Sequence, residues 1–133
     1  MKIDHIGIAV KDIESAKLMY SKILNAEPYK EEIVEEQGVH VVFFKSGKET
    51  KVELLQGLHS ESPISKYIEK KGEGFHHVAY LVEDINKEIE RMISEGFQPL
   101  QEKPKKGANN KMVFFFHPKS TGGTLIELCM PIV

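Results

Sequence analysis

The feature that most constrains this chain is an internal repeat. Residues 5–14 read HIGIAVKDIE and residues 77–86 read HVAYLVEDIN, which is an offset of 72 residues from His5 to His77. Each segment begins with His, continues through small and apolar residues, and then reaches a charge, an Asp and an Ile. A repeat within 133 residues predicts one domain that is built from two similar modules.

Each copy is expected to begin with a strand and then a helix. Asp12 and Asp84 stand where an N-cap belongs, directly before amphipathic patterns. These patterns predict helices over 13–24 and 85–95, and Gly96 ends the second one. We expect the buried helix positions to be Ile13, Ala16, Met19, Tyr20, Ile23, Ile85, Ile89, Met92 and Ile93.

The similarity continues into two further strands. Residues 39–44 (VHVVFF) correspond to 112–116 (MVFFF), and VELL at 52–55 corresponds to LIEL at 125–128. Each copy therefore has the order strand, helix, strand, strand.

The stretches 27–35 and 97–102 leave room for one more strand in each copy. The expected fold class is α+β, with two βαβββ modules. The modules span residues 1–57 and 74–133, and a helical connector covers 58–73.

Four chemically distinctive residues recur with the repeat. His5 and His77 open the first strands, while Glu53 and Glu127 lie inside apolar last strands. If the modules pack around a pseudo-twofold axis, these four side chains meet near it. Two buried carboxylates that meet need a cation between them. Imidazole and carboxylate ligands together suit one divalent ion, such as Co, Ni, Mn, Zn or Mg.

Each of these residues also allows a plainer interpretation. A single His at the start of a strand is more often a hydrogen-bonded structural residue than a metal ligand. The glutamates could form ion pairs with Lys51 or Lys111. The paired recurrence of both residue types favours the metal site.

Composition excludes several classes of function. The net charge is −2, which gives no general attraction for nucleic acid or an anionic membrane. Cys129 is the only cysteine, so no internal disulfide forms, as is typical of a reducing compartment. The N-terminus has no signal-like apolar segment, and no apolar run is long enough to span a bilayer. A cytoplasmic protein is expected.

Five local motifs resemble a known family. They are DHIGIAV at 4–10, EQGV at 36–39, KVELL at 51–55, SPISKYIEKKGEGFHHVAY at 62–80 and HPKSTGGTLIEL at 117–128. With the paired modules, they resemble the vicinal oxygen chelate superfamily, which includes glyoxalase I, extradiol dioxygenases and methylmalonyl-CoA epimerases. The motifs are most similar to those of the epimerases. This resemblance implies a half-open sheet cavity around a metal site.

The resemblance implies that the chain epimerises methylmalonyl-CoA at the carbon alpha to the thioester. The implied metal ligands are His5, Glu53, His77 and Glu127. Some epimerases carry a base Glu two residues beyond QGV, where this chain has Val41. We therefore expect the two proton-transferring bases to be Glu127 and Glu53. His40 is adjacent to Val41, but strand alternation directs it to the opposite face.

The implied partner is a small acyl-CoA, and the family also implies a homodimer. The substrate-binding residues expected from these motifs and from a lysine-rich loop are Gln37, Lys105, Lys106, Lys119 and Ser120. The lysines could hold the phosphates of CoA, or they could simply form a solvated loop.

Two other functions remain open at this stage. A glyoxalase I-like lyase that acts on a glutathione hemithioacetal would use the same four ligands, but Ala9 stands where such enzymes tend to have Arg. A non-catalytic small-molecule binder of the same fold is the second alternative. A dioxygenase is disfavoured, because it uses two His and one carboxylate, whereas this chain offers a fourth ligand.

Overall fold

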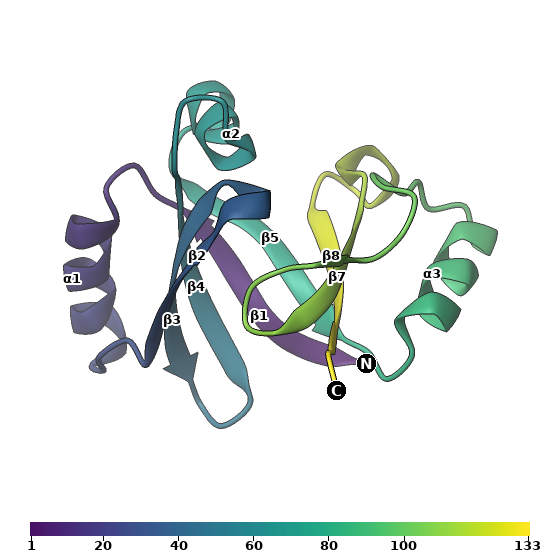
Figure 1. Cartoon of the computed structure of the whole chain (residues 1–133), viewed down its shortest axis with the longest axis horizontal. Helices are drawn as coiled ribbons and strands as arrows, with labels where there is room; N and C mark the ends of the chain where they lie inside the picture. The colour runs from purple at the N-terminus through teal and green to yellow at the C-terminus, as the bar shows by residue number, and fades with distance from the viewer. The chain divides into compact units, whose positions relative to one another are not determined.

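The computed structural model describes residues 1–133 and has an α+β fold (Figure 1). Its elements are β1 (Lys2–Ala9), α1 (Ile13–Leu24), β2 (Lys30–Val34), η1 (Glu35–Gln37), β3 (Val39–Ser46), β4 (Thr50–Gly57), α2 (Pro63–Lys71), β5 (Gly74–Leu81), α3 (Ile85–Ser94), β6 (Lys105–Lys106), β7 (Lys111–Phe116), η2 (Pro118–Ser120) and β8 (Leu125–Pro131). The order βαβββ occurs twice, which confirms the prediction of two such modules.

The chain divides into two compact units. The first unit is His5–His76, and the second unit combines Met1–Asp4 with His77–Val133. The division falls inside β1 and inside β5, so the start of β1 belongs with the C-terminal module. The strand order is β2-β3-β4-β1 in the first module and β5-β8-β7-β6 in the second.

The first unit has one helix-covered sheet face. β1 and β4 run parallel, while β3 is antiparallel to both β2 and β4. α1 lies against this sheet (Figure 1), and its Ile13 and Ala16 pack on alternate strand residues. Those strand residues are Val42, Phe44, Val52 and Leu54. Burying each such large apolar side chain contributes about 1.5–3 kcal/mol.

The second unit repeats this plan. β5 and β8 run parallel, and β7 is antiparallel to both β6 and β8. α3 lies beside this sheet (Figure 1). The apolar cluster beneath it consists of Val82, Ile85, Ile89, Met92, Phe114, Phe116 and Leu128. In both units, therefore, a helix covers one sheet face. In the second unit the opposite face carries a smaller apolar cluster of Ala79, Val113 and Cys129.

Both predicted helix starts are confirmed. The Asp12 side chain accepts a hydrogen bond from the Glu14 amide, and the Asp84 side chain accepts one from the Lys87 amide. Each bond satisfies an amide that the helix itself leaves without a partner, which stabilises the helix by about 1 kcal/mol. None of the α-helices combines the length and the apolar character that crossing a bilayer requires.

Three predicted core positions are wrong. Met19, Ile23 and Ile93 are 51%, 62% and 46% exposed. Each helix has more apolar residues than one sheet face can cover, so the residues at the margin of the apolar stripe remain in solvent.

One predicted strand is also misplaced. Residues 97–102 contain only an isolated bridge from Pro99 to Phe116, and the extra strand of the second module is β6. Proline has no amide hydrogen for a ladder, which disfavours a strand around Pro99. β6 itself has only two residues, too few to produce an alternating pattern in the sequence.

A buried ion pair fixes the start of β1 inside the second unit. The Lys111 Nζ lies 2.8 Å from each carboxylate oxygen of Asp4. Asp4 is 2% exposed and Lys111 is 8% exposed, so water screens neither charge effectively. Because the two residues are 107 positions apart in sequence, this pair ties β1 to β7.

We predict that Lys111→Met destabilises the protein by about 3–5 kcal/mol, because it leaves the buried Asp4 carboxylate without its cation. Urea unfolding followed by circular dichroism measures this loss. The double variant D4N/K111M should recover part of it. As the control, Lys17→Met removes an ion pair to the more exposed Glu31, which should cost about 0.2–1 kcal/mol. A loss below 1 kcal/mol for K111M would contradict the importance of the buried pair.

Candidate metal centre

The first unit places one predicted His beside one predicted Glu. The His5 Nδ1 lies 3.1 Å from the Glu53 Oε2, and the two residues are 5% and 4% exposed. His5 opens the part of β1 that pairs in parallel with β4, where Gly7 lies opposite Glu53. Since alternate residues share a face, His5 and Glu53 both point away from the face that α1 covers.

The second unit contains an equivalent pair. The His77 Nε2 lies 3.0 Å from the Glu127 Oε1, and both residues are 4% exposed. Ala79 of β5 lies opposite Glu127 of β8, just as Gly7 lies opposite Glu53 in the first unit. The Phe115 ring meets the His77 ring edge-on, at 5.8 Å between the centroids, and so restricts its rotation.

The strand registers of the two pairs agree, although His5 faces Glu53 through Nδ1 and His77 faces Glu127 through Nε2. Phe43 of β3 pairs with Glu53, and Phe115 of β7 pairs with Glu127. In each unit, therefore, the His and the Glu come from parallel strands, and a Phe on the next strand is the cross-strand partner of the Glu.

The donor types at these positions fit a divalent metal ion. His5, His77 and Glu127 are buried residues that could serve as ligands of such an ion. Glu53, the fourth predicted ligand, is also buried. Imidazole nitrogens and carboxylate oxygens together suit Co, Ni, Mn or Zn better than an ion that prefers oxygen alone, such as Mg.

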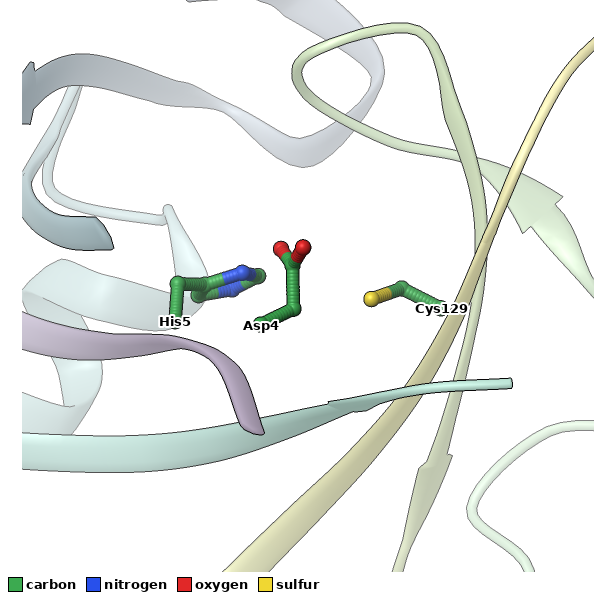
Figure 2. Close-up of side chains that lie close together, drawn as sticks. All are labelled: Asp4, His5 and Cys129. Atoms are coloured by element: carbon green, nitrogen blue, oxygen red, sulfur yellow. The ribbon is translucent and has the colours of Figure 1, made fainter. Parts of the chain in front are cut away.

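A second group of ligand-type side chains was not anticipated from the sequence. Figure 2 shows Asp4, its chain neighbour His5, and Cys129 of β8. Asp4 and Cys129 belong to the second unit and are 2% and 0% exposed. The Lys111 ammonium already neutralises Asp4 through two hydrogen bonds. This group therefore needs no metal ion to balance its charge.

His40 and Val41 point to opposite faces of β3, as strand alternation predicts. The His40 Nε2 lies 3.0 Å from the Glu31 Oε1, on the face that α1 covers. A hydrogen bond from Lys17 of α1 lowers the pKa of Glu31, and the same contact raises the pKa of Lys17. Val41 pairs with Leu55, two residues from Glu53, and so shares its face.

The predicted substrate residues lie at several places. Lys105 pairs with Val113 and Lys106 with Met112, so the two lysines project from opposite faces. Only Lys105 shares the face of Glu127, because Val113 and Phe115 are alternate residues of β7.

The other three residues that the sequence predicted to bind substrate lie in short 3-10 helices. Gln37 ends η1, while Lys119 and Ser120 lie in η2. The Ser120 hydroxyl donates to the His117 carbonyl at 2.9 Å and accepts from the Gln98 amide at 2.9 Å. These bonds give Ser120 a role in holding η2.

Comparison with known proteins identifies the family. Residues 4–116 match the model of the glyoxalase/bleomycin resistance protein/dioxygenase superfamily. The chain belongs to this superfamily. The resemblance predicted from the motifs is therefore confirmed.

Relatives within the superfamily are similar over nearly the whole chain. The uncharacterized protein YqjC of Bacillus subtilis is 39% identical over 130 residues, covering 98% of this chain and 92% of that protein. The mitochondrial methylmalonyl-CoA epimerase of Bos taurus is 40% identical over 128 residues, covering 96% of this chain and 73% of that protein. The chain is thus similar to methylmalonyl-CoA epimerases at about 40% identity.

A solved structure extends this similarity to the fold. A variant of Streptomyces coelicolor methylmalonyl-CoA epimerase, in complex with 2-nitronate-propionyl-CoA, matches with a TM-score of 0.92 and 30% identity. The match covers 100% of this chain and 99% of that one. The chain therefore shares the fold of that epimerase along its whole length.

We predict that cobalt binds without a sulfur ligand. Cys129→Ser should leave the cobalt affinity within about twofold of the parent, because the His and Glu residues supply the donors and Asp4 is already neutralised by Lys111. Absorption spectroscopy of the cobalt-loaded protein tests this. A thiolate-to-cobalt charge-transfer band that disappears in C129S would instead assign the metal to the group in Figure 2.

Proposed function

We propose that this protein is a metal-dependent epimerase that acts on methylmalonyl-CoA. The observation that carries the proposal is the duplicated buried His–Glu pair, with 3.1 Å between His5 and Glu53 and 3.0 Å between His77 and Glu127. This pair occurs in a chain about 40% identical to methylmalonyl-CoA epimerases. A methylmalonyl-CoA epimerase variant with the same fold is in complex with 2-nitronate-propionyl-CoA, which supports an acyl-CoA as the substrate.

The four residues His5, Glu53, His77 and Glu127 would hold one divalent ion. When bound, such an ion acts as a Lewis acid that stabilises negative charge on a thioester oxygen, a contribution of several kcal/mol. The protein supplies the rigid donors, because each imidazole is oriented by a carboxylate within its own unit.

The protein's own proton chemistry depends on carboxylates. Epimerisation breaks the bond between the alpha carbon and its hydrogen on one face and forms a new one on the other. Glu127 is proposed as the base on one face, since it is buried on a strand and positioned by His77. Because Val41 stands where some epimerases carry a base Glu, Glu53 is proposed for the second face, displaced from the metal. Glu127 and Glu53 are thus both proposed as ligands and as bases.

The substrate's charged portions require cations near the same sheet face. Lys105 projects from that face of the second unit, and Lys119 lies in η2. We propose that these two lysines contact the anionic groups of an acyl-CoA, together with Gln37 of η1 and Ser120 of η2. Lys106 projects from the opposite face and is therefore the weakest of the proposed contacts.

The protein loaded with cobalt should convert one epimer of methylmalonyl-CoA to the other, and in deuterium oxide it should incorporate deuterium at the alpha carbon. Chiral analysis and mass spectrometry measure the two events. A reaction without protein controls for spontaneous exchange. Removal of the metal by a chelator should reduce both rates, and added cobalt should restore them.

Two results would overturn this proposal. Turnover of a glutathione hemithioacetal with no activity on methylmalonyl-CoA would assign the protein to the glyoxalase I type. Binding of methylmalonyl-CoA with no conversion and no exchange, under any added divalent ion, would make it a binder.

A further inference from the structure

The second unit has a hollow on the side of its sheet that α3 covers. Tyr80 of β5 and Leu128 of β8 line this hollow, are cross-strand partners, and pack with the apolar cluster beneath α3. His77 and Glu127 lie an odd number of residues away along the same two strands, so they project from the opposite side of the sheet. The hollow, called here the α3 hollow, is therefore separate from the His77–Glu127 pair.

Three parts of the second unit enclose the α3 hollow. They are the sheet, the C-terminal half of α3, and the turn at residues 120–122 that continues η2 into β8. Figure 1 shows this turn near the start of β8 and α3 beside the same strand. The volume of about 460 Å³ lies within the range of about 300–1,000 Å³ that is typical of small-molecule sites.

The walls of the α3 hollow are mostly apolar. Met92 and Leu128 are buried, while Phe97 and Ile126 are half-buried and line the same space. Burying apolar ligand surface against such side chains is favourable, and a flexible methionine can adjust to the shape of the ligand. The body of a fitting ligand is therefore apolar.

The hydroxyl groups of the turn are already used within the protein. The Ser120 hydroxyl donates to the His117 carbonyl and accepts from the Gln98 amide. The Thr121 hydroxyl donates to the Thr124 carbonyl. These bonds hold the turn together, so the two hydroxyls do not set the polarity of a ligand.

Two other polar groups at the α3 hollow are not used in this way. Arg91 has the only charged side chain that lines the hollow, and its Nε donates to the Glu88 Oε1 at 3.2 Å. The two terminal nitrogens of Arg91 make no hydrogen bond to the protein, and neither does the Tyr80 hydroxyl. The α3 hollow thus combines apolar walls with unused donors, one of which carries a positive charge.

We propose that the α3 hollow binds a monocarboxylate with an aliphatic chain. The carboxylate lies at Arg91, whose two terminal nitrogens match the two oxygens of a carboxylate group. The chain lies along Phe97, Ile126 and Leu128, and the Tyr80 hydroxyl is the second donor. This binding site is additional to the proposed epimerase site and does not depend on it.

The charge of the lining favours a monoanion over other ligands. One guanidinium that already contacts Glu88 can balance a single negative charge. A phosphate dianion would bring a second charge for which no further cationic side chain lines the hollow, and an unpaired charge against apolar walls is costly. Arg91 would repel a cation.

Titration calorimetry of the purified protein with octanoate tests the proposal. Octan-1-ol has the same chain without the charge and should bind at least about tenfold more weakly, because the charge-assisted hydrogen bonds to Arg91 are lost. Hexanoate has two methylene groups fewer and should also bind about tenfold more weakly, because it buries less apolar surface.

Arg91→Gln should weaken octanoate binding by about tenfold and leave octan-1-ol binding unchanged. Lys87→Gln is the matched control, because it removes the same charge from α3 at a residue that does not line the hollow. K87Q should stay within about twofold of the parent. Y80F, which keeps the ring, should weaken octanoate binding less than R91Q. Thermal unfolding checks that the variants are folded.

Nuclear magnetic resonance of the methionine methyl groups locates the ligand. Octanoate should shift the signal of Met92, which lines the α3 hollow, and leave that of Met19 on α1 in place. No binding at millimolar octanoate, equal affinity in the parent and R91Q, or bound octanoate with an unchanged Met92 signal would each overturn the proposal.

Discussion

The structure depends on how it buries two carboxylates inside apolar strands. Glu53 and Glu127 are each 4% exposed, and an isolated carboxylate in such surroundings costs several kcal/mol. In each unit the carboxylate lies within hydrogen-bonding distance of an imidazole, at 3.1 Å in the first unit and 3.0 Å in the second. The imidazole comes from the neighbouring parallel strand. The parallel pairing of β1 with β4 and of β5 with β8 therefore lowers the free-energy cost of burying these two carboxylates, because it brings an imidazole beside each of them. A cation shared by the two pairs is the proposed completion of this arrangement.

The two copies of the repeat share the strand positions of the His–Glu pair but differ around it. The strand registers of the two units agree at His, at Glu and at the cross-strand Phe. The edge positions differ in charge, with Glu32 in one unit and Lys105 in the other. The two copies therefore agree where the His–Glu pairs lie and differ in charge at the edges of their sheets.

Much of the local structure follows from patterns within a few residues. Asp12 and Asp84 predicted the helix starts, and the 72-residue offset predicted which strands correspond. Met19 and Ile23 were predicted to be buried but are exposed, which shows the limit of periodicity. The pattern gives the direction of an apolar stripe on a helix but not the width of the surface that covers it.

Contacts between residues distant in sequence could not be predicted from the sequence. The Asp4–Lys111 pair joins positions 107 residues apart, and no local pattern distinguishes Lys111 of β7 from the lysines that precede it in sequence. The sheet face from which Glu32 projects could not be predicted for a similar reason. Its face depends on the register of β2 against β3, which the turn at η1 and Gly38 sets and which a shift of one residue would reverse. The His–Glu recurrence was visible only because the repeat displayed it twice.

The central claim is that both His–Glu pairs serve one metal ion, and the most direct test is the stoichiometry of metal bound to chelator-treated protein. Native mass spectrometry during cobalt titration measures it. The account predicts one tightly bound ion per chain, with affinity lost on His5→Asn and lost equally on His77→Asn. Two ions per chain, no bound ion, or full affinity in either variant would contradict it.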